Sequence, residues 1–205
     1  MAFRTLIFDF DGVIADTRDL IIKVGNTYAA ETGRDPLSEE DINTYYEQGA
    51  RALMAKRSFS ILELARLLKR GSELFAAEAG SVKMVPGVGE AIRDASGSGT
   101  RVAVLTSNTE ESVKRIMGDF SKELAGIFPE KDFFGKAAKL KKVIRSFGID
   151  PADVLYIGDE PRDMIAARKA GAHPIGAAWG FGSKRSLISA GAEKVLVRPE
   201  EIAEL

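Results

Sequence analysis

Residues 4–13 read RTLIFDFDGV, an apolar run that ends in two aspartates and a glycine. A continuous apolar run, without polar alternation, is typical of a strand that is buried on both faces of a parallel sheet. We therefore predict a strand over 4–10. Similar runs predict further strands at 101–105 (RVAVL), 154–157 (VLYI), 174–178 (PIGAA) and 193–197 (EKVLV).

Helical patterns lie between these strands. In 139–147 the apolar residues Leu140, Val143, Ile144 and Phe147 fall on one helical face, and Gly148 is a stop signal. Comparable patterns predict helices at 91–96, 110–119 and 161–170. Strands that alternate with helices indicate an α/β fold with a doubly wound, Rossmann-like parallel sheet.

Residues 16–83 break this alternation, because no β-rich run occurs in them. Helical spacing is found in 20–32 and 60–79, and Ser38-Glu39-Glu40-Asp41 is a capping-box signal for another helix. We predict a small helical domain of residues 16–83, inserted after the first strand of a core made of 1–15 and 84–205. The linkers would be 12–15 and 82–88.

The composition excludes several classes of function. The formal net charge of −1 over 205 residues gives no reason to expect a nucleic acid or an anionic membrane as partner. The chain has no cysteine and one histidine, so any metal must be held by oxygen, which favours Mg²⁺. No stretch approaches the roughly 18 apolar residues of a membrane helix, and we expect a cytoplasmic protein.

Acidic residues follow two of the predicted strands, at the sheet edge where α/β proteins bind ligands. Asp9 is a candidate nucleophile towards phosphorus, and Asp9 and Asp159 can hold Mg²⁺. If the chain bends after the first strand, the carboxyl group of Asp11 can act as general acid and then as base, and its backbone carbonyl can complete the metal shell. Acids buried this close would repel each other strongly without a cation.

Two further positions are candidates for binding phosphate. Ser107-Asn108-Thr109-Glu110 follows the second strand and is also a capping box, so Ser107 has either role or both, because a helix N-terminus is a natural phosphate site. Lys136, which follows Gly135 at the start of a helical segment, would offset phosphoryl charge and orient the nucleophile. Lys139, one turn further on, competes with it for this role.

Together these residues resemble the haloacid dehalogenase-like superfamily, in its phosphoglycolate phosphatase-like branch. Asp9-Phe10-Asp11-Gly12 matches the first motif, Thr106-Ser107-Asn108 the second, Lys136 the third, and Gly158 through Asp163 the fourth. Thr106 competes with Ser107 for the second motif, and the longer Lys-Pro-x-Pro form of the third is absent. The resemblance implies that Asp159 is a metal ligand, that Asp163 lies beside the metal shell, and that Asn108 helps to bind the phosphate.

We therefore expect a Mg²⁺-dependent phosphatase that forms an aspartyl-phosphate on a small anionic phosphorylated metabolite, with 2-phosphoglycolate as the named candidate. A sugar phosphomutase on the same scaffold remains open. A haloacid dehalogenase is disfavoured by Asp11, and a non-catalytic binding protein is disfavoured by the complete set of motifs. The basic residues between Arg51 and Arg70 are either a solvated helix face or contacts to an anionic substrate.

Overall fold

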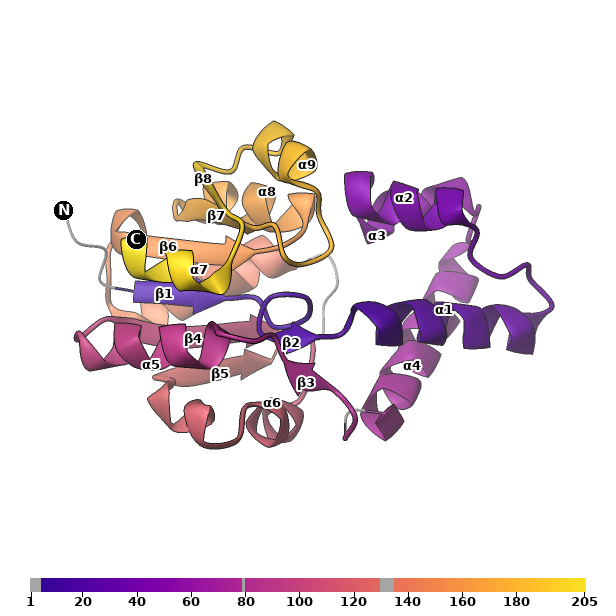
Figure 1. Cartoon of the computed structure of the whole chain (residues 1–205). Coiled ribbons are helices and arrows are strands. Elements are labelled where there is room, and N and C mark those ends of the chain that lie inside the picture. The colour runs from indigo at the N-terminus through magenta and orange to yellow at the C-terminus, as the bar shows by residue number, and fades with distance from the viewer. Residues whose placement is uncertain (1–4, 79, 130–134) are drawn as a thin grey trace.

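In the computed structural model, the described residues are 5–78, 80–129 and 135–205. Within them, six strands form one parallel sheet in the order β5-β4-β1-β6-β7-β8. The central strand β1 pairs on one side with β4 and on the other with β6 (Figure 1). The strands are β1 (Thr5–Phe8), β4 (Arg101–Thr106), β5 (Gly126–Pro129), β6 (Val154–Gly158), β7 (His173–Ala177) and β8 (Lys194–Leu196).

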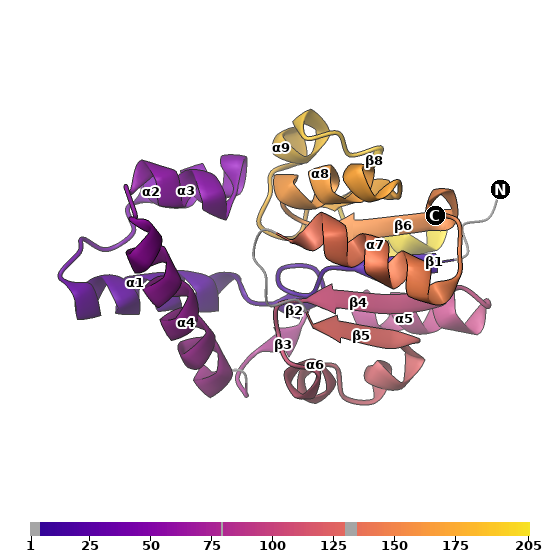
Figure 2. The same ribbon diagram turned by 180° about the vertical axis from the view of Figure 1, so that it is seen from behind.

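Helices cover both faces of this sheet, and alternate residues of β1 face the two layers. Leu6 and Phe8 belong to one buried cluster, which includes residues of α5 (Val88–Gly97) and α6 (Glu110–Met117). Ile7 belongs to a second cluster, which includes residues of α7 (Lys136–Phe147) and α8 (Pro161–Ala170) (Figure 2). The predicted doubly wound α/β fold is therefore confirmed.

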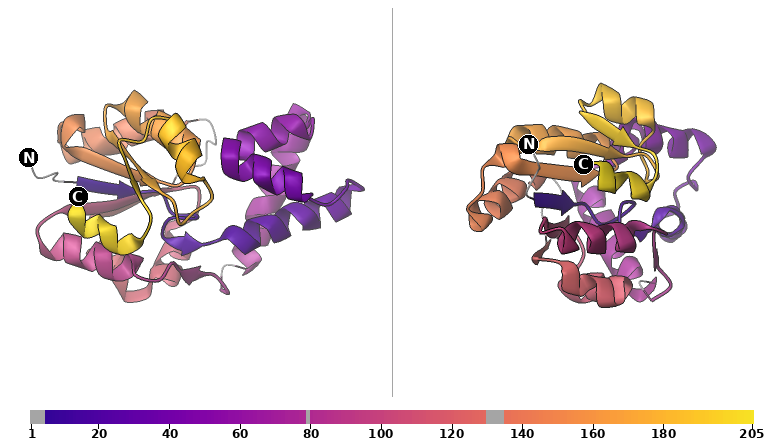
Figure 3. Two further views of the ribbon diagram at one scale, coloured as in Figure 1. Left: turned by 45° about the horizontal axis from the view of Figure 1, so that its top comes forward. Right: turned by 60° about the vertical axis from the view of Figure 1, so that its left-hand side comes forward.

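Four helices form a separate group beyond the carboxyl ends of the sheet strands (Figure 3). They are α1 (Arg18–Thr32), α2 (Glu39–Gln48), α3 (Ala50–Lys56) and α4 (Ile61–Glu78). Two short antiparallel strands, β2 (Ala15–Asp16) and β3 (Lys83–Met84), connect this group to the sheet. Ser38 caps α2 with the predicted capping box, in which its hydroxyl accepts the Asp41 N–H at 3.1 Å.

Several short elements were not predicted, namely β2, β3, β5, α3, α9 (Lys184–Ser189) and the 3₁₀ turns at Gly118–Glu123, Pro151–Asp153 and Pro199–Glu204. The apolar periodicity predicted α7 from residue 139, and the helix begins at Lys136, where Gly135-Lys136 had indicated the start of a helical segment. The predicted elements or motifs also included Arg4, Ala79 and Phe134, which lie outside the described residues. No helix in the described part of the chain has the length and apolar character needed to cross a membrane.

Candidate active site

The loop after β1 brings two aspartates to the carboxyl edge of the sheet. Asp9 is 6% exposed, and one of its carboxylate oxygens accepts the N–H of Phe10 at 2.9 Å. The chain then turns sharply, because Gly12 takes a left-handed conformation with a φ of 75° and its N–H donates to the carbonyl of Ala15. This is the bend that the sequence argument required for Asp11 to face a different direction from Asp9.

Lys136 joins the loop after β1 to α8. Its Nζ lies 2.6 Å from Oδ2 of Asp9 and 2.6 Å from Oδ1 of Asp163. The other oxygen of Asp163 accepts the N–H of Glu160 at 2.9 Å, so Asp163 holds both the lysine and the start of α8. Among the described residues, Lys136 rather than Lys139 is the lysine in contact with Asp9.

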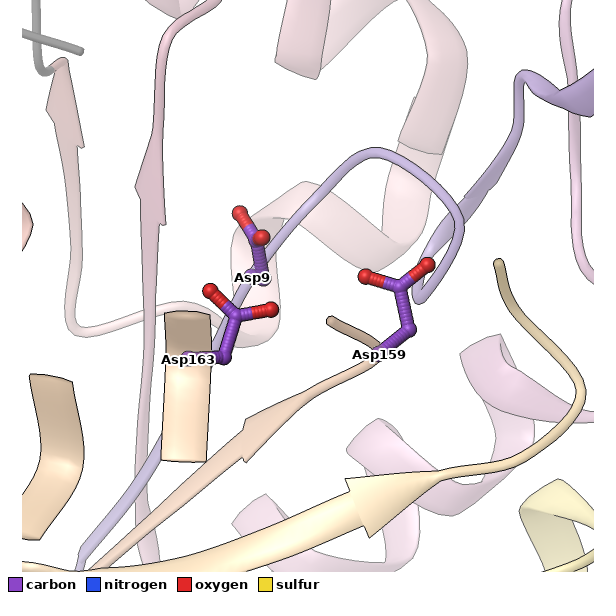
Figure 4. Close-up of side chains that lie close together, drawn as sticks. All are labelled: Asp9, Asp159 and Asp163. Carbon is purple, nitrogen blue, oxygen red and sulfur yellow. The ribbon is translucent and has the colours of Figure 1, made fainter. Parts of the chain in front are cut away.

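Asp9, Asp159 and Asp163 form a triplet of carboxylates. One oxygen of each lies within 4.8 Å of the others, and all three residues are buried. Figure 4 shows that the carboxylates come from the end of β1, the end of β6 and α8 and lie around one small space. The Asp11 carboxylate is not part of this triplet, so a role for Asp11 in metal binding would fall to its backbone carbonyl, as the sequence argument supposed.

Burial disfavours the charged forms of two carboxylates in the triplet, those of Asp9 and Asp159. Burial and the neighbouring carboxylate of Asp163 raise the pKa of Asp9, although Lys136 opposes this. Burial and the carboxylates of Asp163, Glu160 and Asp9 raise the pKa of Asp159. For Lys136, attraction by Asp163 and Asp9 outweighs burial and raises the pKa. An oxygen-lined, buried and electron-rich site of this kind fits a hard divalent cation such as Mg²⁺.

Three glycines, Gly12, Gly180 and Gly182, lie close to Asp159. Its Oδ2 accepts the N–H of Phe181 at 2.8 Å. A β-carbon added at Gly12 or Gly180 would collide with the Asp159 side chain, and one added at Gly182 would collide with its backbone carbonyl. These three glycines therefore leave the room that the carboxylate occupies.

Asp11 lies in a different environment from the triplet. One carboxylate oxygen accepts the side-chain N–H of Asn108 at 2.8 Å, and the other is buried and has no hydrogen-bond partner in the part of the chain that the structure describes. Burial and the charge of Asp9 raise the pKa of Asp11 to about 7, against the opposing effect of Asn108. A carboxyl group that is protonated near neutral pH can donate a proton to a leaving group.

The segment after β4 corrects one prediction. Helix α6 is capped by Thr109, whose hydroxyl accepts the Ser112 N–H at 3.2 Å, so the predicted capping box from Ser107 is wrong. The hydroxyl of Thr106 is buried and accepts both N–H groups of Asn108, whereas Ser107 is exposed and lines the same cavity as Asp11. Of the two hydroxyls, that of Ser107 is the one placed to meet a ligand.

Three residues near this edge were not predicted. Glu160 is 2% exposed and pairs with Arg162. Tyr45 of α2 lies close to Glu160, and burial together with the charge of Glu160 raises the pKa of Tyr45. The centre of its ring is 5.2 Å from the centre of the Phe181 ring. The capping pattern of Glu160 and Asp163 was readable in the sequence, but the contact with Tyr45 depends on the placement of the inserted helices.

Comparisons with known proteins find relatives that align with most of the chain. The sequence is 27% identical over 207 residues to a phosphoglycolate phosphatase of Synechococcus elongatus, covering 98% of this chain and 96% of the relative. It is 31% identical over 189 residues to a phosphoglycolate phosphatase of Agrobacterium fabrum, covering 85% of this chain and 80% of the relative.

Solved structures share the fold. A predicted phosphatase from Clostridium acetobutylicum superimposes with a TM-score of 0.86 at 21% identity and full coverage of both chains. A haloacid dehalogenase-like hydrolase from Streptococcus pneumoniae gives a TM-score of 0.81 at 18% identity, covering 98% of this chain and 97% of that one. The sequence model of the haloacid dehalogenase-like hydrolase family matches residues 6–177, and the chain therefore belongs to that family.

Proposed function

We propose that the protein is a Mg²⁺-dependent phosphatase that hydrolyses a phosphate monoester of a small organic molecule through an aspartyl-phosphate. The observation that carries this proposal is the environment of Asp9, whose buried carboxylate contacts Lys136 at 2.6 Å and belongs to a triplet of carboxylates. Asp9 is held by the ammonium group of Lys136 and lies beside carboxylate oxygens that could bind a metal cation. Two positive charges at a carboxylate nucleophile suit attack on a phosphoryl group, because the phosphoryl oxygens carry negative charge.

The reaction has two balanced steps. In the first, an oxygen of Asp9 attacks phosphorus while the bond to the leaving oxygen breaks, and the leaving alkoxide takes the proton of Asp11. In the second, water attacks the phosphorus of the aspartyl-phosphate and gives a proton to the Asp11 carboxylate, which restores both aspartates and releases phosphate. A pKa of about 7 suits Asp11 to both duties near neutral pH.

The remaining site residues hold the phosphoryl group. Mg²⁺ bound by Asp9, Asp159 and the backbone carbonyl of Asp11 would neutralise the non-bridging oxygens. Ser107 and the first N–H groups of α6, which have no acceptor within the helix, would donate hydrogen bonds to these oxygens. Asn108 also contacts Asp11 and would keep its carboxyl group in position.

We further propose that residues 16–83 act as a cap domain inserted between the core segments 1–15 and 84–205. The proposal is supported by the β2–β3 pairing, in which Ala15 lies opposite Met84 at the two ends of the insert. Because two relatives are phosphoglycolate phosphatases, 2-phosphoglycolate is the first ester to assay.

The test is a single-turnover reaction with a ³²P-labelled ester, quenched in acid. We expect label on the wild-type protein and none on the Asp9→Asn variant, which keeps the shape of the side chain but loses the nucleophile. Asp119→Asn is the matched control, because the Asp119 side chain is 84% exposed on a distant 3₁₀ turn. Equal labelling of Asp9→Asn and wild type would contradict the covalent mechanism.

A further inference from the structure

A large cavity extends from the proposed active site into the inserted helices. Its volume is about 640 Å³, and on the sheet side it is lined by Asp11, Ser107, Asn108 and Asp159. Pockets for drug-sized molecules have volumes of about 300–1,000 Å³. The cavity therefore has room for an alcohol part far larger than the two carbons of phosphoglycolate.

The walls that the inserted helices contribute are mainly apolar. They include Ile21 and Val24 of α1, Leu53 of α3, and Leu67 and Phe75 of α4. These side chains come from different helices and line one space, so a ligand there would contact several of them at once. Removing apolar surface from water in this way favours an apolar ligand.

The cations that line the cavity are already paired. Arg34 lies 2.6 Å from Glu63, and Arg57 lies 2.7 Å from Asp41. Arg162, at the sheet edge, pairs with Glu160. Each arginine that the structure describes in this lining thus has a carboxylate beside it.

This arrangement bears on the second charged group of a substrate. A carboxylate that entered the cavity would lose its hydration and would meet arginines whose charge is already neutralised. An uncharged chain would lose no ionic hydration and would bury apolar surface. We therefore expect the cavity to bind an uncharged hydrocarbon chain more tightly than a chain that carries a second anionic group.

We propose that the ester cleaved at this site carries an uncharged, largely apolar alcohol part that reaches between the inserted helices. The proposal rests on the phosphatase function proposed above and defines its substrate class. The phosphoryl group lies at the sheet edge, and the alcohol part occupies the space lined by α1, α3 and α4.

Phosphate release from a series of n-alkyl phosphates tests this proposal. The leaving alcohols from ethyl to octyl have nearly the same acidity, so differences in kcat/KM along the series report on binding. We expect kcat/KM to rise by roughly fourfold per methylene until the cavity is filled. We also expect ethyl phosphate to be cleaved better than 2-phosphoglycolate, and heptyl phosphate at least tenfold better than its ω-carboxylated analogue.

The outcomes separate the two proposals. A flat alkyl series, or a preference for 2-phosphoglycolate over ethyl phosphate, would overturn the apolar substrate class and leave the phosphatase function standing. Release of phosphate from none of the esters, by protein shown to be folded, would overturn the phosphatase function itself.

A charge substitution gives an independent test. Glu63→Gln keeps the capping pattern at the start of α4 but removes the negative charge beside Arg34. We expect it to raise kcat/KM for the carboxylated heptyl analogue relative to heptyl phosphate by about tenfold. The control is Glu73→Gln, because Glu73 pairs with Arg70, which does not line the cavity. An unchanged ratio in Glu63→Gln would show that Glu63 does not set the charge selectivity and would contradict the proposal.

Discussion

Replacing Lys136 by methionine removes a cation that contacts both Asp9 and Asp163. The side chains of Lys136, Asp9 and Asp163 are 14%, 9% and 0% exposed, so both carboxylates are buried and the lysine is largely buried. Removing one partner of a buried ion pair costs about 3–5 kcal/mol, because an unpaired charge stays behind. For a chain of this length the cost lowers the Tm by roughly 6–20 °C.

Differential scanning fluorimetry in EDTA, with Lys139→Met as the control, measures this effect. Lys139 lies one turn further along α7, and its replacement removes the same charge without breaking a contact to Asp9; we expect its Tm to change by less than about 2 °C. The loss in Lys136→Met should shrink as the pH falls, because protonation of a carboxylate removes the unpaired charge. Equal melting temperatures for the two variants would refute the reasoning.

Adding Mg²⁺ should separate the structural role of Lys136 from its proposed catalytic role. In Lys136→Met the carboxylate triplet has lost the cation that lies 2.6 Å from Asp9 and from Asp163, so Mg²⁺ should bind more tightly and raise the Tm more than in the wild type. Catalysis should still fall, by about 10²–10³ in kcat, because the nucleophile is no longer oriented. A weaker stabilisation by Mg²⁺ in the variant would show that the metal is held elsewhere.

Three further predictions concern other aspartates. Asp159→Asn should raise the Mg²⁺ concentration needed for half-maximal activity, and full activity after exhaustive chelation would remove the metal from the mechanism. Asp11→Asn should slow the hydrolysis of alkyl phosphates more than that of nitrophenyl phosphate. In the wild type, kcat/KM for alkyl esters should fall as the pH rises through the pKa of Asp11, which is about 7 and would be lowered by bound Mg²⁺. The variant should lack this decline. For Asp41, hydrogen bonds from Arg57 and Lys56 outweigh burial and lower the pKa to about 2, from an ordinary value of 3.8. The ionised carboxylate should therefore add about 2 kcal/mol to the free energy of unfolding above pH 4, and this stabilisation should be lost towards pH 2. In urea unfolding, Asp41→Asn should be less stable than the wild type at pH 7, and this difference should disappear at pH 2.

The strands beside the site were predictable because they are continuous apolar runs followed by polar residues. β1 and β6 are buried along their whole lengths, and Asp9 and Asp159 follow them directly. Parallel strands bring their carboxyl ends to the same edge, so the two acids had to lie close together. β5 escaped prediction because its sequence, GIFP, contains both a glycine and a proline in four residues.

The choice between neighbouring residues was harder to predict than the site itself. Lys136 lies 127 positions from Asp9, and the start of α7 decides which lysine reaches it. The apolar periodicity of that helix begins only at Leu140 and favoured a start at residue 139, whereas Gly135-Lys136 indicated the start that the structure has. In SNTEES, both Ser107 and Thr109 match an N-cap pattern, and the cap falls to Thr109 because β4 and the following bend extend further than the apolar run.

The three glycines around Asp159 give the active site a vulnerability that reactive groups alone do not reveal. Gly12, Gly180 and Gly182 supply no proton, no charge and no ligand atom, yet a single methyl group on any of them would overlap Asp159. In a saturation library selected for activity, alanine at these positions should be depleted as strongly as asparagine at Asp9. We therefore expect the positions needed for activity to include glycines that matter because they lack a side chain. A search restricted to polar side chains would overlook them.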